Sequence, residues 1–469
     1  MLITLLQPLQ GALDASMVIY GGMVLILLLS VALTLIIQTG SISTRRRELR
    51  HLRKLNLSTS NMTDQYDPKF DAPENSPVDG PIRIKSLYIH PVKSCGYIEV
   101  NRALLTKMGF LYDRYFAIAT EDPKAQTSSN SKWRFISQRT YPNMSLIETE
   151  LWLPDKDSDP RDPLVQAGGC VVLKFEDPDT PDWISRLETG FHTGNFSSQP
   201  QVSLVAPLHP TPSQMQELKL GMKGFGIHYR QASGIDLGSM PSVAVALPKL
   251  RKFLKIPKDH GLTLFKCTPD TLTRTDRNLA PLNYIGSPAM HGYTDQQPIN
   301  INSLSSVHSV STLLPPENRP LNALRFRANI WITGAPAYDE ETWKRYRILP
   351  KVANTESRAD VSPMLSVVCR TSRCTIPNVD PDRGVFDADI PLPNKKRGKP
   401  QPSTTLVEYR TVEDGNKAAL GYLGMHCVPE DRSLKEASDQ NLGLYVEVGD
   451  EIEVLERGVH LYGSTANEY

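Results

Sequence analysis

The chain has 469 residues, enough for two or three domains of ordinary size, and its 40% hydrophobic and 22% charged residues are typical of a globular protein. A formal net charge of +1 argues against a protein that binds nucleic acid through its whole surface, and we expect no nucleic-acid partner. The six cysteines are scattered without a Cys-x-x-Cys pair, which indicates reduced thiols rather than a disulfide framework.

A membrane anchor is predicted near the start of the chain. Residues 17–37, MVIYGGMVLILLLSVALTLII, contain no charged residue, and at about 1.5 Å of rise per residue such a helix just spans a bilayer core. Basic residues follow directly, namely Arg45, Arg46, Arg47, Arg50, Arg53 and Lys54. Because basic flanks stay on the cytosolic side, the sequence predicts a single-pass protein with its bulk in the cytosol. The alternative is a buried core helix, which the isolation of the segment disfavours.

Residues 38–80 are predicted to form a basic flank and a disordered linker. From 57 to 80 the chain is polar, contains proline and has few large apolar side chains. Because such a segment has little to bury, we expect it to be a tether between the anchor and the folded part.

Strand-forming residues begin at 82. IRIKSLYIHPVKS is rich in β-branched and aromatic residues up to Pro91, and GFLYDRYFAIA at 109–119 predicts another strand. Arg114 lies inside that apolar stretch. It either pairs with Asp113 or another acid, or binds an anion.

The middle of the chain combines short strands with one helical pattern. WRFISQRTYPNMSLI at 133–147 predicts two strands around a turn, and residues 197–215 look like an inserted loop. Apolar spacing predicts a helix over 241–254, although Pro248 interrupts it, and 261–267 predicts a strand.

Two later segments combine polar residues with clear structural patterns. YTDQQP at 293–298 precedes INSLSSVHSVSTLL, a predicted helix whose N-terminus could face an anion. NALRFRANIWITG at 322–334 predicts the clearest strand of the chain and carries Arg327. An ordinary edge salt bridge is the alternative interpretation of Arg327.

Two cysteines follow a short predicted strand at 365–368. Cys369 and Cys374 are separated by RTSR, whose arginines could stabilise a thiolate, and VDPDRG at 379–384 predicts a turn. Both cysteines could instead be small buried hydrophobic residues, which is common for free cysteine.

The last part of the chain predicts strands that complete a barrel. Residues 391–404 are basic and proline-rich, as in an exposed loop insertion. GYLGMHCV at 421–428 and LYVEVGDEIEVLE at 444–456 read as strands. We interpret His426 beside Cys427 as part of a core pair.

Five short motifs, in this order, resemble those of the MOSC-domain family, which includes molybdenum-cofactor sulfurases and mitochondrial amidoxime-reducing components. They are HPVKSC at 90–95, Asp113-Arg114, YTDQQP at 293–298, FRAN at 326–329 with Ala328 where the family has proline, and SRC with VDPDRG at 372–384. The resemblance covers about residues 82–457 and implies a mainly β, α+β fold. It implies a MOSC N-terminal β-barrel-like domain at 82–235 and a MOSC β-barrel with small helices at 236–457, preceded by one transmembrane helix. A cofactor would occupy the cleft between the two domains.

The resemblance also implies site residues. The cysteine of the last motif ligates molybdenum in the family, which implies Cys374 as metal ligand and catalytic residue. Lysine and serine of the first motif and arginine of the second hold the phosphate of the cofactor, which implies Lys93, Ser94 and Arg114. The other implied cofactor-binding residues are Asp295, Gln296, Gln297, Arg327 and Asn329.

Two segments leave alternatives open. Gln296 and Gln297 stand where the family has small or hydroxylated residues, and their amides could bond the edge of a pterin or narrow access for a substrate. Ser137-Gln138-Arg139 occupy the place of a family segment near the pterin, or form a solvated hairpin tip.

The function implied by the resemblance is that of a membrane-anchored oxidoreductase with molybdenum and a pyranopterin. It would reduce N-hydroxylated, amidoxime-type substrates with electrons from cytochrome b5 and its NADH-dependent reductase. Family precedent favours the mitochondrial outer membrane, with the endoplasmic reticulum possible. One alternative is a cofactor carrier or sulfur-transfer module without turnover, and another is a membrane-tethered scaffold whose cysteines lie in the core.

Overall fold

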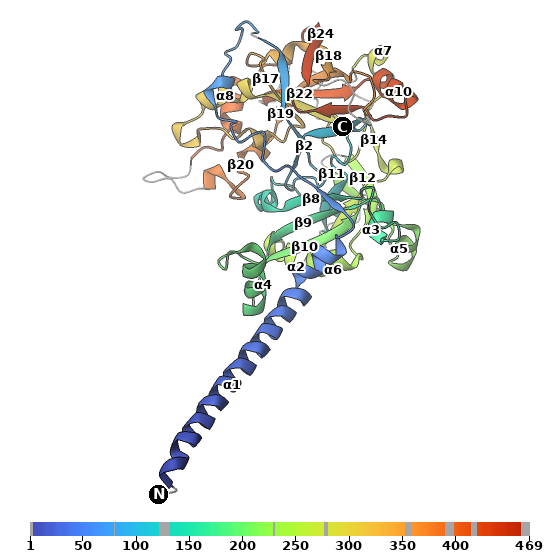
Figure 1. Cartoon of the computed structure of the whole chain (residues 1–469). Coiled ribbons are helices and arrows are strands. Elements are labelled where there is room, and N and C mark those ends of the chain that lie inside the picture. The colour runs from blue at the N-terminus through green and yellow to red at the C-terminus, as the bar shows by residue number, and fades with distance from the viewer. Residues whose placement is uncertain are drawn as a thin grey trace.

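The structure of the chain is a computed structural model that describes residues 3–78, 80–121, 132–227, 230–275, 280–351, 358–389, 398–413 and 420–460, with side chains from Met17 onward. Two strand-rich parts lie one above the other, and a single long helix projects from the lower part (Figure 1). This arrangement confirms the expectation of a strand-rich fold with small helices and one leading apolar helix.

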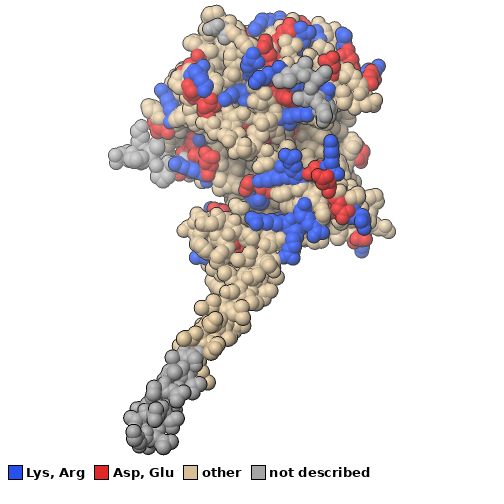
Figure 2. Space-filling model, in the orientation of Figure 1, with Lys and Arg blue, Asp and Glu red and all other residues tan. Residues whose placement is uncertain are grey.

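The projecting helix is α1, Ile3–Thr39. Its segment Met17–Thr39 is long and apolar enough to cross a membrane, and its side chains are exposed. Figure 2 shows the described part of α1 without charged side chains, and blue basic side chains where it joins the folded part. α2, Ser41–Glu48, follows after Gly40 and carries Arg45, Arg46 and Arg47 in its last turn. Positive charge at this end of a helix interacts favourably with the helix dipole.

The segment expected to be a disordered linker is instead packed against the folded part over its described residues. β1, Arg53–Leu55, pairs antiparallel with β8, Glu148–Leu153. Leu52 and Met62 are buried, and the backbone N–H of Asn61 donates to Glu99 at 2.7 Å. The composition was misleading because several of the few apolar residues, among them Leu52 and Met62, enter hydrophobic clusters.

The lower part contains a four-stranded sheet and a closed barrel. The sheet has the order β1-β8-β9-β10, with β9 at Cys170–Glu176 and β10 at Gln201–Pro207. The barrel runs β11-β12-β13-β6-β7, with bounds Met222–Ile227, Arg230–Asp236, Gly261–Lys266, Phe116–Glu121 and Trp133–Phe135. Phe225 and Phe265 stack inside it at 4.4 Å between ring centroids. The helices of this part are α3 Pro163–Gln166, α4 Trp183–Thr193, α5 Pro212–Glu217 and α6 Pro241–Phe253.

The upper part is one large sheet that closes on itself. Its order is β17-β16-β22-β19-β18-β24-β2-β3, with bounds Ile330–Thr333, Ile299–Ser303, Gly421–Pro429, Met364–Arg373, Trp343–Leu349, Glu451–Arg457, Ile82–Ile89 and Ile98–Val100. Because β2 also pairs with β17, the sheet forms a ring. β22 is buried along its whole length, as a strand between two neighbours and two covered faces must be.

Smaller elements complete the upper part. Its helices are α7 Leu282–Ile285, α8 Leu304–Leu313, α9 Ser403–Tyr409 and α10 Asp431–Asp439. The short strands are β4 Arg102–Thr106, β5 Gly109–Phe110, β14 Thr273–Arg274, β15 Met290–His291, β20 Val379–Asp380, β21 Val385–Phe386 and β23 Tyr445–Glu447.

The predicted division at 235/236 does not separate the sheets. β2 and β3 belong by sequence to the first range but lie in the upper sheet, whereas β13 belongs to the second range and closes the lower barrel. The chain therefore crosses between the two parts more than once, and buried residues of both parts form one continuous hydrophobic cluster. These crossings bring segments that are far apart in sequence to the same place.

Several local predictions also need correction. The strand predicted at 109–119 is broken between β5 and β6, and the strand predicted at 322–334 begins only at Ile330. The predicted loop 197–215 contains β10 and the start of α5, and α6 continues through Pro248. Of the predicted insertion 391–404, residues 391–397 lie outside the described residues, and Ser403 begins α9.

Candidate functional site

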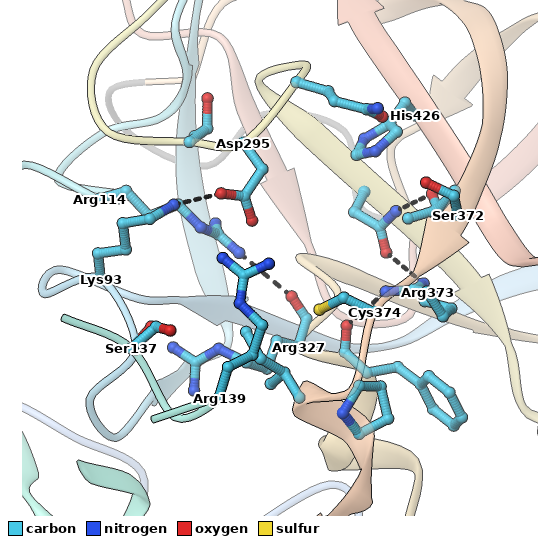
Figure 3. A pocket seen from close by; sticks show the side chains of 18 of the residues that line it. Lys93, Arg114, Ser137, Arg139, Asp295, Arg327, Ser372, Arg373, Cys374 and His426 are labelled. Atoms are coloured by element: carbon cyan, nitrogen blue, oxygen red, sulfur yellow. Dashed lines mark hydrogen bonds and ion pairs between the residues drawn. The ribbon is translucent and has the colours of Figure 1, made fainter. Parts of the chain in front are cut away.

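A cleft lies where the lower barrel meets the end of the upper sheet, and its cavity volume is about 280 Å³. All nine residues that the resemblance singles out line it: Lys93, Ser94, Arg114, Asp295, Gln296, Gln297, Arg327, Asn329 and Cys374. Figure 3 shows the lysine, Arg114 and Asp295 on one side, and the cysteine on the other. The fold therefore gathers five sequence motifs into one site.

Lys93 is fixed by acceptors at the edge of the cleft. Its ammonium donates to the backbone carbonyl of Tyr293 at 2.9 Å and pairs with Asp295. Burial lowers the pKa of Lys93 to about 8, against the opposing effect of Asp295. Asp295 is more than half exposed, so water screens its negative charge. Lys93 is therefore only partly neutralised by Asp295 and remains able to bind an anion.

Arg114 does not lie in a strand, as predicted, but in the turn between β5 and β6. Its φ of 55° is left-handed, and its backbone N–H donates to the carbonyl of His90 at 2.8 Å. The guanidinium pairs with buried Asp113, whose other oxygen accepts from the N–H of His90 at 2.7 Å. Both alternatives for Arg114 are thus compatible, because it is paired and also lines the cleft.

Arg327 ends the short 3-10 turn Ala323–Phe326 with a left-handed φ of 52°. Within the described residues, its guanidinium makes no hydrogen bond or ion pair, so the edge salt bridge considered above is absent there. Burial first, and then repulsion by Arg114, lower the pKa of Arg327 to about 10. A guanidinium in this setting would be stabilised by an anion in the cleft.

Three lining residues have left-handed backbones although none is glycine: Ser94, Arg114 and Arg327. Such conformations are uncommon for residues with side chains and cluster at functional sites. Each of the three lies in a motif that the resemblance assigns to phosphate or cofactor contact. Three of the nine left-handed non-glycine residues in the described part of the chain therefore line this cleft.

The charge of the lining is strongly positive. Among its described residues, one carboxylate, Asp295, faces six cationic side chains: Lys93, Arg114, Arg139, Arg325, Arg327 and Arg373. Arg325 is held by Asp387 at 3.1 Å and by two backbone carbonyls, so not every cation is available to a ligand. The remaining excess of positive charge suits a ligand with several negative charges.

The two glutamines supply unpaired acceptors. The side-chain oxygens of Gln296 and Gln297 are buried, and no hydrogen-bond partner for them lies within the described part of the chain. Because a buried acceptor without a donor is costly, these oxygens favour a ligand that presents N–H groups. The edge of a pterin has such groups.

Asn329 lines the cleft, and its side chain is also hydrogen-bonded to the backbone of two strands. Its side-chain amide donates to the carbonyl of Tyr88 at 3.2 Å, and its oxygen accepts from the N–H of Asn300 at 3.1 Å. It thereby connects β2 to β16 at the base of the cleft. Its side chain therefore helps to position the wall of the cleft that it lines.

The two cysteines differ sharply. Cys369 lies within β19 with 1% of its surface exposed, whereas Cys374 follows the end of β19 and is exposed. The sulfur of Cys374 points toward the middle of the cleft (Figure 3). Of the two thiols, only Cys374 can reach a ligand there.

Arg373 fixes the backbone just before this cysteine. Its guanidinium donates to the carbonyls of Leu423 at 2.7 Å and Phe326 at 2.9 Å, and to the side-chain oxygen of Asn300 at 3.2 Å. Arg370, predicted as a second thiolate partner, instead bonds Glu341 at 2.8 Å and points away from the cleft. The broken register of β19 against β22 leaves only Arg373 on the cleft side.

His426 also lines the cleft, which corrects its interpretation as part of a core pair. Its Nδ1 is buried without a partner in the described part of the chain, and burial lowers its pKa to about 3, so the ring is neutral. Cys427 packs in the core cluster. Since successive residues of a strand face opposite sides, a buried Cys427 could have placed His426 on the other side from sequence alone.

Other lining residues were identified less clearly from sequence. Ser137 and Arg139 line the cleft, in agreement with the pterin-side alternative for their segment, whereas the side chain of Gln138 donates to the carbonyl of Ser94 at 2.9 Å. Asn300 and Thr371, joined at 2.6 Å, had no sequence signal. They come from β16 and β19, whose pairing with β22 could not be read from the sequence.

Metal chemistry at this site would depend on Cys374. Over the described residues, no group of three or more His, Cys, Asp or Glu side chains is placed to hold a metal ion. A thiolate is a soft ligand, and it suits a metal whose other ligands are sulfur atoms of an organic cofactor. The donor set of cations, amide oxygens and one accessible thiol fits an anionic pterin cofactor that carries its own metal.

Comparisons with known proteins agree with this reading. The MOSC N-terminal beta barrel domain matches residues 81–176, and the MOSC domain matches residues 288–453. Human mitochondrial amidoxime reducing component 2 is 23% identical over 339 residues, covering 71% of this chain and 74% of the relative. Mouse mitochondrial amidoxime-reducing component 1 is 24% identical over 344 residues, with 72% and 75% covered. Rat mitochondrial amidoxime reducing component 2 is 29% identical over 340 residues, with 71% and 74% covered.

Proposed function

Because this chain is a MOSC-domain protein, we propose that it is a membrane-anchored molybdenum-cofactor oxidoreductase that reduces N-hydroxylated, amidoxime-type compounds. The observation that carries the proposal is the position of the exposed thiol of Cys374 opposite a wall of cations, in one cleft. The names of the relatives support an oxidoreductase of the amidoxime-reducing type.

Each wall of the cleft has a distinct task in binding. Lys93, Arg114 and Arg327 would hold the phosphate of a molybdenum pyranopterin through charge-assisted hydrogen bonds. Gln296 and Gln297 would accept hydrogen bonds from the pterin edge. Cys374 would supply a thiolate to the metal.

When bound, the cofactor supplies the exchange of two electrons that converts an N-hydroxyl group and two protons into an N–H group and water. The residues that line the cleft would orient the substrate. Neutral His426 offers a hydrogen-bonding nitrogen to the same cleft, and Arg373 holds the backbone of Cys374 in place. Neither residue needs to change its charge in these tasks.

The electron donor is proposed from the resemblance and from the anchor. Cytochrome b5 with its NADH-dependent reductase would deliver electrons at a cytosol-facing membrane surface, and the mitochondrial outer membrane is the membrane that the names of the relatives favour. The anchor α1 would keep the oxidoreductase at the same surface as these donors.

The test is reduction of benzamidoxime to benzamidine by the purified full chain with NADH, cytochrome b5 and its reductase. Turnover that depends on every component and on bound molybdenum supports the proposal. Molybdenum without turnover would instead indicate a cofactor carrier, and a chain that is folded but free of molybdenum would contradict both functions.

A further inference from the structure

The helix α4, Trp183–Thr193, exposes an apolar face at the lower edge of the folded part. Its sequence explains the helix, since Asp182 caps the N-terminus by accepting from the N–H of Ser185 at 2.7 Å, and Gly194 ends it in a left-handed conformation. Trp183 is 68% exposed, and Ile184 and Phe191 are also exposed. An amphipathic helix with an exposed tryptophan and phenylalanine is costly in water.

Phe196 extends this apolar face beyond the end of the helix. It is 61% exposed, and its ring packs edge to face on Phe191 at 5.3 Å between centroids. Gly190 permits this arrangement, because a Cβ there would lie 2.2 Å from the ring of Phe196. The aromatic side chains are therefore held together on the surface rather than scattered.

The buried part of α4 is fixed to the end of the membrane-spanning segment. Buried Glu188 accepts from the backbone N–H of Ile42 at 2.8 Å and from Ser41 at 3.4 Å, just after α1 ends at Thr39. The contact is close, because a Cβ on Gly40 would lie 2.2 Å from the carboxylate carbon of Glu188. Figure 1 shows α4 level with the upper end of α1.

We propose that α4 is a second membrane contact, whose apolar face of Trp183, Ile184, Phe191 and Phe196 lies in the interface of the bilayer that α1 spans. The proposal rests on the anchor but not on the cofactor. A lipid surface is the occupant because the face continues directly from the point where the span leaves the bilayer. Tryptophan and phenylalanine are the residues that such interfaces favour.

The surrounding charges agree with a lipid surface. Exposed Arg46, Arg47 and Arg50 lie just beyond the end of α1, where they would meet lipid phosphates if α1 spans the bilayer. Arg186 on α4 is exposed, and its side chain is long enough to reach lipid headgroups. A single helix lets the attached part tilt and rotate freely, whereas a helix and a second contact fix its orientation.

The experiment uses the full chain in vesicles of phosphatidylcholine and phosphatidylserine, with some acyl chains brominated near the headgroups to quench nearby tryptophan fluorescence. Three variants are compared: wild type, Trp183→Phe, and Trp133→Phe, which removes a half-buried tryptophan in β7 of the lower barrel. We expect a quenched component in wild type that is lost in Trp183→Phe and kept in Trp133→Phe.

Four results would overturn the proposal. Equal quenching in wild type and Trp183→Phe would show that Trp183 does not meet lipid. Quenching of Trp183 by aqueous iodide but not by lipid would place the face in water, and protection from both quenchers would indicate a protein partner or a second copy. Failure of the chain to float with vesicles would remove the anchor on which the proposal rests, and leaves the cofactor proposal untouched.

Discussion

The guanidinium of Arg114 donates a hydrogen bond to the backbone carbonyl of Arg327 at 3.3 Å. This contact joins the first part of the chain to a motif more than two hundred residues later and places two cations at one wall of the cleft. Since like charges repel, the arrangement is stabilised when an anion lies between them. The first prediction follows from this pair.

Replacing Arg327 by glutamine should lower cofactor occupancy strongly while the protein stays folded. Arg327 has no ion pair among the described residues, so its loss leaves no buried partner uncompensated. Loss of one charge-assisted hydrogen bond costs roughly 1.5–3 kcal/mol, or about ten- to hundredfold in affinity. Molybdenum and pterin per folded chain are the quantities to measure.

A matched control is Arg347→Gln, which removes an exposed arginine paired with Glu453 on the outside of the upper sheet. It should leave occupancy unchanged. Arg114→Gln is a poorer probe, because it would strand the buried carboxylate of Asp113 and destabilise the fold as well. Full occupancy in Arg327→Gln would remove this residue from the anion site.

The affinity of the protein for the cofactor should decrease as the pH rises through about 8, which is the pKa of Lys93 in the free site. Above that value Lys93 in the free site is neutral, so binding an anion must first return a proton to it. Lys93→Arg should abolish this dependence, because arginine stays protonated. Retention of pterin during dialysis from pH 7 to 10 measures it, and identical profiles for both proteins would contradict the assignment.

The lowered pKa of Lys93 also affects the stability of the cofactor-free protein, which should increase with pH whereas cofactor affinity decreases. Between about pH 8 and the ordinary lysine value of about 10.4, the unfolded chain holds a proton on Lys93 that the folded chain has lost. The free energy of unfolding should therefore rise with pH in this window through this group, and be independent of it below pH 8. The difference between wild type and Lys93→Met in urea unfolding isolates the effect.

Removal of residues 1–39 should give a soluble, folded protein, whereas removal of residues 1–56 should destabilise it. The longer deletion removes β1 together with Leu49 and Leu52, which are 3% and 8% exposed. Loss of each buried leucine costs about 1.5–3 kcal/mol. Thermal unfolding of both truncated proteins tests this, and equal midpoints would show that β1 and its neighbours contribute nothing to the fold.

Much of the fold was predictable because it depends on local patterns. The apolar run of α1, the β-branched residues of β2 and the helical spacing of α6 all gave the expected element. The prediction of a disordered linker was wrong because composition only counts apolar residues. Leu52 and Met62 stabilise the packed segment through the hydrophobic clusters in which they lie. Such contacts depend on partners distant in sequence.

The candidate site was predictable where a residue lies in a recognisable motif. Lys93, Arg327 and Cys374 were found in this way. Asn300 was not assigned a place in the cleft, and Arg373 was expected only as a partner of a thiolate, because their observed contacts are hydrogen bonds between β16, β19 and β22. Strand order is a tertiary property that no local pattern contains.

Replacing Cys374 and replacing Cys369 should have different effects on activity. Cys374→Ser replaces a soft, accessible ligand by a hard hydroxyl, so it should keep bound pterin but lose turnover per bound molybdenum. Cys369→Ser introduces a hydroxyl into the core and should keep turnover, with a loss of about 1–3 kcal/mol in stability. Inactivity of Cys369→Ser alone would place the metal on the other sulfur.

The most direct test of the central claim is the metal and cofactor content of the purified full chain, measured by elemental analysis together with detection of the oxidised pterin. The account predicts molybdenum and pterin in equimolar amounts with the protein, and a change in the X-ray absorption edge of molybdenum in Cys374→Ser that is absent in Cys369→Ser. A folded chain that contains neither molybdenum nor pterin, after expression in cells that make the cofactor, would contradict it.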